Sequence, residues 1–165
     1  PTPAASATAA GPAAADAPAA ADASPATAPA GTPAADAVAD CPDAALVVTS
    51  ATDKPAYPVG SAVRLTLGVR NTGSVACRRD LGAGAVGLVV TSGSDRVWSS
   101  NDCGQRGASV VTLAPGESRA VQSTWAGLRS KPGCPGQQPA SPAGTYRVSG
   151  RVGPLTVPGA VFRLS

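Results

Sequence analysis

The chain of 165 residues contains no histidine and no methionine, and it has only one glutamate, Glu117, and two lysines, Lys54 and Lys131. Without histidine it lacks the usual general base, the usual partner of a catalytic cysteine and the commonest zinc ligand. A pair of catalytic glutamates is excluded, and neither lysine stands at S-x-x-K spacing from a serine. We therefore expect a protein with no enzyme activity, no cofactor and no metal site.

Aromatic residues are also scarce, at 3% of the chain, and no run of 18 apolar residues occurs that would suit a membrane helix. Valine and leucine must therefore build most of the core, and a small core of this kind often needs covalent support. The four cysteines are the natural candidates for that support. Because the chain starts at Pro1, we interpret it as a mature or truncated product whose signal peptide or membrane anchor lies outside this sequence.

Composition divides the chain into two parts. Residues 1–40 consist almost entirely of Ala, Pro, Thr, Ser, Gly and Asp, and the prolines interrupt any helix that the alanines favour. This pattern predicts a disordered Ala/Pro-rich linker or stalk over residues 1–40, whose Ser and Thr beside Pro also suit O-glycosylation. Residues 41–165 carry all 13 basic side chains and only six of the ten acidic ones, so the predicted folded domain is strongly basic.

From Cys41 onward, short apolar runs alternate with clusters of Gly, Pro, Asn and Ser, which is typical of an all-β sandwich. The clearest strand is AVRLTLGVRN, in which apolar and polar side chains alternate so that one face is buried. We predict eight strands, at residues 44–51, 62–71, 85–91, 95–99, 109–113, 118–125, 144–152 and 155–164.

The four cysteines all follow or precede predicted strands. If the strands run alternately up and down, all four thiols gather at one end of the sandwich, where they can pair. Antiparallel pairing of the first two strands favours Cys41 with Cys77, which leaves Cys103 with Cys134, although Cys77 with Cys103 is also reasonable. Two alternatives to disulfides are weaker: the spacings lack the C-x-x-C knuckles of zinc sites, and a reactive Cys77 beside Arg78 and Arg79 would leave an odd thiol. Disulfides imply an extracytoplasmic domain.

A series of turn and strand motifs occurs in a familiar order: YPVG at 57–60, NTG at 71–73, VW at 97–98, LAPGE at 113–117, Trp125 and PAGTY at 142–146. Across about residues 54–150 this order resembles the immunoglobulin-like domain of the intracellular proteinase inhibitor (BsuPI-type) family. It is also similar to secreted or membrane-tethered actinobacterial domains of unknown function, in which one cysteine precedes the first strand and another follows an NTG turn. The resemblance implies an immunoglobulin-like antiparallel β-sandwich of 7–8 strands, here with two disulfides.

Two features could form binding surfaces. Arginines lie on predicted solvent faces, with Arg64 and Arg70 on one strand and Arg147 and Arg151 on another, and a further group, Arg78, Arg79 and Arg106, lies near the cysteines. Such faces could bind an anionic glycan or a lipid surface, whereas nucleic acid is disfavoured because exposed aromatics for stacking are lacking. The loop at residues 126–143 is the second feature, since a loop of this length is often functional.

The sequence thus favours a monomeric, non-enzymatic binding or accessory module of the cell envelope, secreted or tethered by a segment that precedes this chain. Its partner is expected to be a protein, contacted through sheet edges or the loop at residues 126–143. A proteinase inhibitor that uses Arg129 and Lys131 of this loop is an alternative, and an anionic glycan or lipid bound by the arginine faces is another.

Overall fold

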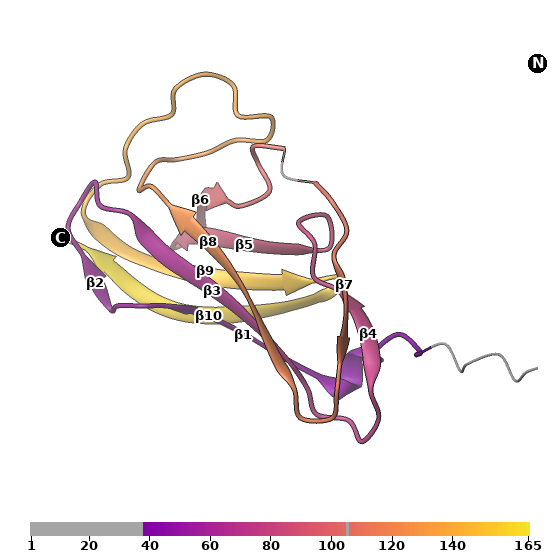
Figure 1. Ribbon diagram of the computed structural model, residues 1–165. Helices are drawn as coiled ribbons and strands as arrows, with labels where there is room; N and C mark the ends of the chain where they lie inside the picture. The colour runs from indigo at the N-terminus through magenta and orange to yellow at the C-terminus, as the bar shows by residue number, and fades with distance from the viewer. Residues whose placement is uncertain (1–37, 105) are drawn as a thin grey trace, which may run out of the picture. The chain divides into compact units, whose positions relative to one another are not determined.

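The computed structural model describes residues 38–104 and 106–165, and this part of the chain folds into facing β-sheets without an α-helix (Figure 1). The predicted linker therefore lies outside the described residues, except for residues 38–40. No helix in the described part is both long and apolar enough to cross a membrane. A short 3-10 helix, η1 (Asp43–Ala45), precedes ten strands: β1 (Leu46–Thr52), β2 (Ala56–Tyr57), β3 (Val63–Asn71), β4 (Cys77–Asp80), β5 (Val86–Ser92), β6 (Asp95–Ser99), β7 (Val110–Leu113), β8 (Ser118–Trp125), β9 (Gly144–Val152) and β10 (Leu155–Leu164).

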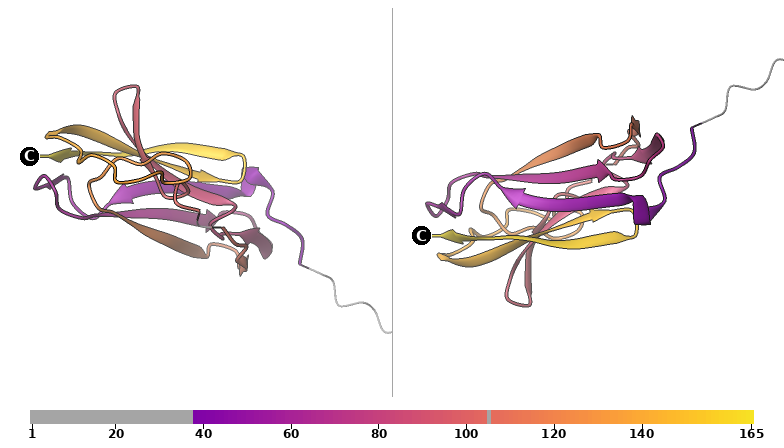
Figure 2. Two further views of the ribbon diagram at one scale, coloured as in Figure 1. Left: turned by 90° about the horizontal axis from the view of Figure 1, so that it is seen from above. Right: turned by 90° about the horizontal axis from the view of Figure 1, so that it is seen from below.

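The strands form a two-layer sandwich, which confirms the predicted fold class. One layer has the order β1-β3-β8, the other has the order β2-β10-β9-β5-β6, and β4 pairs separately with β7. All ladders are antiparallel except the short pairing of β2 with β10. Figure 2 shows the two layers edge-on, with β1 and β3 facing β9 and β10. Contacts of β1 with β10 and β9 hold the layers together along one side.

Strand β3 supplies the middle of the three-stranded layer. Val63, Leu65, Leu67 and Val69 are all buried, whereas Arg64 and Arg70 between them are exposed, as the alternating pattern predicts. In the other layer, small aliphatic residues such as Val90 of β5 and Val148 of β9 are completely buried as well. The interior is therefore aliphatic over most of its length.

The aromatic residues are concentrated at one end of the sandwich. Tyr57, Trp125, Tyr146 and Phe162 form one cluster with ring centroids 5.6–6.0 Å apart. They come from β2, β8, β9 and β10, so the cluster joins both layers. Aromatic rings bury large areas, and pairs of rings in offset or edge-on contact gain additional interaction energy. This end of the core therefore contributes strongly to the stability of the sandwich.

Each predicted strand has a counterpart that begins and ends within two residues of the expected position. Two strands were missed. The first, β2, has only two residues and follows Pro55. The second, β4, reads CRRD, and its two consecutive arginines show neither alternation nor apolar content. It is a strand because its four residues pair with β7, a contact between segments more than thirty residues apart that no local pattern reveals.

The structure contains the disulfides Cys41–Cys77 and Cys103–Cys134, with Cα–Cα distances of 4.8 and 5.0 Å. This is the pairing that the strand arrangement favours, and it leaves no thiol for a zinc site or for a reactive Cys77. Because disulfides persist in oxidising compartments, they point to an extracytoplasmic environment.

The expectation that all four cysteines gather at one end is wrong. Cys77 lies beyond the end of β3 and Cys134 lies beyond the end of β8, and these two strands are antiparallel, so their ends are at opposite ends of the layer. Because β4 was not predicted, the alternation of strand directions along the chain was counted with one strand too few. The two disulfides therefore stabilise different regions.

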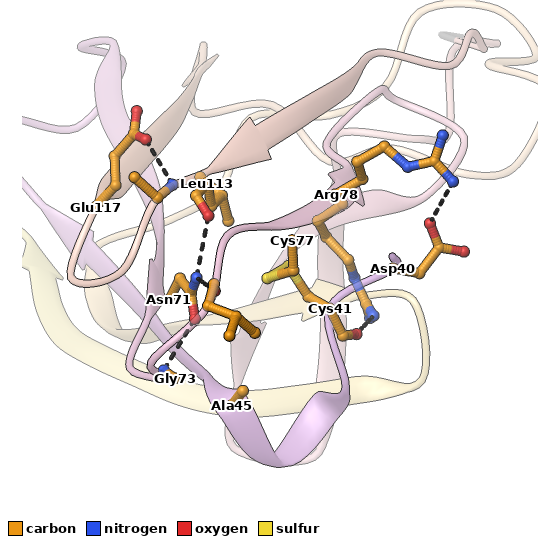
Figure 3. Close-up of a disulfide and its surroundings, with 12 residues drawn as sticks. Asp40, Cys41, Ala45, Asn71, Gly73, Cys77, Arg78, Leu113 and Glu117 are labelled. Carbon is orange, nitrogen blue, oxygen red and sulfur yellow. Dashed lines mark hydrogen bonds and ion pairs between the residues drawn. A yellow bond between two sulfur atoms is a disulfide. The ribbon is translucent and has the colours of Figure 1, made fainter. Parts of the chain in front are cut away.

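The first disulfide adjoins a buried asparagine, Asn71, at the end of β3 (Figure 3). The side-chain amide of Asn71 donates to the carbonyls of Val75 and Leu113, at 2.9 and 3.0 Å, and its oxygen accepts the N–H of Gly73 at 2.9 Å. Its backbone also bonds the turn between β7 and β8. Asn71 is fully buried, and its side chain and backbone together bond the turn at residues 73–75, the end of β7 and the turn after β7.

We predict that Asn71→Ala lowers the free energy of unfolding by about 3 kcal/mol, because it leaves buried carbonyls without a donor. Urea unfolding with both disulfides intact measures the change. Thr72→Ala is the control, since the hydroxyl of Thr72 donates to the carbonyl of Ala45 at an exposed position and its loss should cost under about 1 kcal/mol. Equal losses in the two variants would contradict the role assigned to Asn71.

Candidate functional site

The loop at residues 126–143, here called the long loop, joins the end of β8 to the start of β9 and is the longest connection between strands in the described part of the chain (Figure 1). Both of its ends are tied to the aromatic cluster. The indole N–H of Trp125 donates to the carbonyl of Leu128 at 2.7 Å, and the hydroxyl of Tyr146 donates to the carbonyl of Pro142 at 2.6 Å. Burial raises the pKa of Tyr146, so its hydroxyl remains a donor over the whole physiological range.

A second set of contacts fixes the middle of the long loop to the segment after β6. The disulfide joins Cys134 to Cys103, and the N–H of Gly133 donates to the carbonyl of Asp102 at 2.8 Å. The N–H of Ser130 bonds the carbonyl of Val97 on β6 at 2.9 Å. Within the loop, the two segments that flank the apex are joined by an isolated antiparallel β-bridge between Leu128 and Ala140.

The carboxylate of Asp102 lies under the loop and is almost completely buried, with 4% of its side chain exposed. It accepts a hydrogen bond from the guanidinium of Arg96 at 2.6 Å and another, short, bond from the hydroxyl of Ser130. Burial alone would raise the pKa of Asp102, but the bonds from Arg96 and Ser130 outweigh it and hold the pKa below its ordinary value. The charged carboxylate is thus a brace between β6 and the loop.

Arg129 forms a second, more exposed ion pair between the long loop and β6. Its guanidinium makes two hydrogen bonds of 2.8 Å to the two carboxylate oxygens of Asp95, at the start of β6. This forked geometry raises the pKa of Arg129 and lowers that of Asp95. The two basic residues proposed for the inhibitor differ in exposure, since the ion pair leaves Arg129 half-buried, whereas Lys131 is exposed.

The apex of the long loop (residues 131–138) is exposed except for Cys134 and Gln138, which are half-buried. Cys134 is the one non-glycine residue in the described part with a left-handed backbone, at φ 47°, and Gly133 and Gly136 on either side have φ of 82° and 66°. These turns are kept in place by the disulfide and by the bond from the N–H of Cys134 to the carbonyl of Lys131. The apex therefore combines surface exposure with a fixed backbone.

A hollow of about 320 Å³ lies beside the apex, between the loop and the ends of β6 and β8. Its lining includes the half-buried ring of Trp98, the disulfide, the side chain of Leu128, and the amides of Gln137 and Gln138. An apolar wall with a few polar groups is the usual composition of a recognition pocket. Trp98, from the VW motif at residues 97–98, packs against the core on one side and is the one aromatic residue that is also partly exposed to solvent.

The buried contacts of Asp102 were also missed. An aspartate near a turn commonly bonds backbone N–H groups, and Asp80 does so, since it accepts from Gly82 and Ser109. Asp102 instead bonds Ser130, which is 28 residues away, and no local pattern could have indicated this pairing.

No protein-family model matches this chain, and no curated protein matches it. Among solved structures it is similar to a β-glucosidase from Erythrobacter marinus, with 16% identity, a TM-score of 0.47, and coverage of 73% of this chain and 15% of that one. A cycloisomaltooligosaccharide glucanotransferase from Paenibacillus sp. gives 27% identity, a TM-score of 0.41, and coverage of 69% and 13%. A CARDB domain from Pyrococcus furiosus gives 15% identity, a TM-score of 0.36, and coverage of 73% of this chain and 90% of that one. With TM-scores below 0.5, these likenesses carry no argument about function.

We predict that the buried Asp102 carboxylate makes the free energy of unfolding fall as the pH becomes acidic. Because folding lowers the pKa of Asp102, its contribution is complete above the ordinary aspartate pKa of about 4 and is lost as the pH falls below it. Asp102→Asn should therefore lower the free energy of unfolding by about 2–3 kcal/mol at pH 7, with the difference from wild type shrinking toward pH 3. Urea unfolding at each pH measures it.

Asp95→Asn provides the matched control, since it removes from an arginine pair a carboxylate that is itself more than half exposed. An exposed pair contributes under about 1 kcal/mol. A pH-independent difference between wild type and Asp102→Asn would contradict the charged brace.

Proposed function

We propose that this protein is a non-enzymatic binding module of the cell envelope, secreted or tethered to the cell surface, which holds a protein partner with the apex of the long loop. The observation that carries the proposal is the double attachment of the loop to the segment after β6. The disulfide Cys103–Cys134 and the buried Asp102–Ser130 contact fix the middle of the loop, while most of the apex stays exposed.

Rigidity of this kind favours binding because association otherwise has to order a flexible loop, at a free-energy cost for every residue that becomes fixed. A loop presented by a sandwich is a frequent binding element for the same reason. The hollow beside the apex adds a place for one side chain of the partner, with Trp98 as an apolar wall and the amide of Gln137 at its edge. Buried aromatic contacts of this type dominate the energetics of protein interfaces.

The relation to the intracellular proteinase inhibitor family belongs to this proposal as well. Its support is that residues which carry the resemblance hold the fold together here. Asn71 binds three segments, Gly116 adopts a φ of 76° in the turn that bonds Asn71, and Trp125 and Tyr146 anchor the long loop. These roles are structural, so they support a shared fold rather than a shared inhibitory activity.

The inhibitor alternative requires a basic side chain that can enter the pocket of a protease. Arg129 would have to break its ion pair with Asp95 to do so, which leaves Lys131 as the better candidate of the two. Stoichiometric inhibition of a trypsin-like protease that is lost in Lys131→Ala would favour this alternative over the accessory module.

Site-specific photo-crosslinking tests the proposal. Gln137→benzoylphenylalanine places the probe on the apex, and Ala120→benzoylphenylalanine places it on the exposed face of β8. In an envelope preparation we expect one discrete adduct from position 137 and none of that mass from position 120. Excess unlabelled wild type should abolish this adduct because it competes for the same partner.

The variant Cys103→Ser/Cys134→Ser separates rigidity from contact chemistry, because it frees the apex without changing its exposed side chains. We expect it to compete at least about tenfold less well than wild type, since the loop must then be ordered on binding. Equal competition by this variant, or the same adduct from position 120, would contradict a site at the braced apex.

A further inference from the structure

The outer face of the five-stranded layer carries a group of arginines, here called the arginine face: Arg147, Arg151 and Arg163. On β9, Arg147 and Arg151 point outward while Tyr146, Val148 and Val152 are buried. On β10, Arg163 likewise alternates with buried Phe162 and Leu164. Three exposed guanidinium groups therefore share one side of this layer.

No carboxylate of the described residues neutralises the arginine face. The ion pairs in residues 38–104 and 106–165 use Arg78, Arg79, Arg96, Arg119 and Arg129, and they engage Asp40, Asp43, Asp102, Glu117 and Asp95. The two other carboxylates of this part also have partners, since Asp53 accepts from the hydroxyl of Tyr57 and Asp80 accepts backbone N–H groups. Positive charge is thus concentrated where the domain supplies no counter-charge.

The face is hollowed beside two of its arginines. A hollow of about 280 Å³ is lined by Arg151, by the hydroxyl residues Ser99, Ser149 and Thr156, and by Asn101, above Gly87. Gly87 lies opposite Arg151 on the neighbouring strand, and the side-chain amide of Asn101 packs against it, so the floor of the hollow is formed by backbone and this amide.

A second hollow, of about 290 Å³, is lined by Arg147, Thr91, Thr145 and Val161 and reaches Gly93 in the turn between β5 and β6. Figure 2 shows that this hairpin projects beyond the five-stranded layer on its outer side, so it borders the face at one end. Each hollow therefore combines one guanidinium group with several neutral hydrogen-bonding groups.

From this arrangement we infer that the arginine face binds a linear anionic polysaccharide, with an acidic group at each hollow and sugar hydroxyls on the neutral groups between them. Arg147 and Arg151 are four residues apart on an extended strand, which separates them by about 13 Å. A guanidinium group binds carboxylate, sulfate or phosphate in a forked geometry. The hydroxyls of Ser149 and Thr156 match the donors and acceptors of a sugar.

Two other polyanions fit less well. A membrane surface would favour apolar side chains that insert between headgroups, and Val161 is the one large exposed hydrophobic residue on this face in the described part. A single-stranded nucleic acid would need aromatic platforms, but Tyr146, which borders the second hollow, is buried in the aromatic cluster. A carbohydrate chain, in contrast, would use the neutral hydroxyl groups in the hollows as hydrogen-bond partners.

The opposite layer offers a matched control. Arg64 and Arg70 on β3 are also two exposed arginines on one strand, and they form no ion pair with a described carboxylate. Neither lines a hollow of the kinds seen beside Arg147 and Arg151. Removing either pair changes the net charge by the same amount.

Isothermal titration of the full chain with oligogalacturonate and with dextran sulfate tests the inference, with methyl-esterified oligogalacturonate as the neutral ligand. We expect at least one anionic probe to bind, the neutral ester not to bind, and affinity to fall steeply with salt. Arg147→Ser/Arg151→Ser should weaken binding about tenfold, and Arg64→Ser/Arg70→Ser less than about threefold.

Equal weakening in the two double variants would overturn the site, because binding would then follow net charge alone. Binding of neither anionic probe would also overturn it. Stronger binding to phosphatidylglycerol vesicles than to either polysaccharide, with the same dependence on Arg147 and Arg151, would assign the face to a lipid surface instead. Since none of these residues belongs to the long loop, the outcome is independent of the crosslinking test.

Discussion

The aromatic cluster is the contact on which the arrangement of this domain depends. An interior of valine and leucine can hold two sheets together, but it does not by itself position the segment that joins them. Trp125 and Tyr146 do both, because their rings pack in the core while their polar atoms bond the long loop at 2.7 and 2.6 Å. With Tyr57 and Phe162 they use four of the five aromatic residues of the chain at one end. Scarcity of aromatics is therefore compensated by their concentration.

Electrostatic contacts also position loops relative to the sheets. Few carboxylates are present, and most of those in the described part bind arginines or backbone N–H groups of turns and loops. Asp102 is the clearest case, since a buried charge is tolerated only when its hydrogen bonds offset the loss of solvent, and Arg96 and Ser130 supply them. Because acids are committed to structure, the remaining arginines keep their charge available at the surface.

The sequence was sufficient for features that repeat locally. Alternation in β3 predicted its buried face, and Gly and Pro predicted the turns between most strands. It was insufficient where the partner is remote: β4 is a strand only because β7 pairs with it, and the brace of Asp102 depends on Ser130. One missed strand then reversed the predicted end at which Cys134 lies. Parity errors of this kind affect the placement of loops more than the choice of fold.

The segment that follows β6 connects the two candidate binding surfaces. Ser99 and Asn101 line a hollow of the arginine face, whereas Asp102 and Cys103 hold the long loop. Such proximity does not in itself produce allostery, which requires an element with two alternative states that both ligands bias differently. This segment has a disulfide, an ion pair to the buried carboxylate of Asp102 and backbone bonds on one short stretch, and each of these contacts opposes its movement. We therefore regard the surfaces as independent sites on one rigid body, where occupation of both by linked ligands would raise avidity through effective concentration.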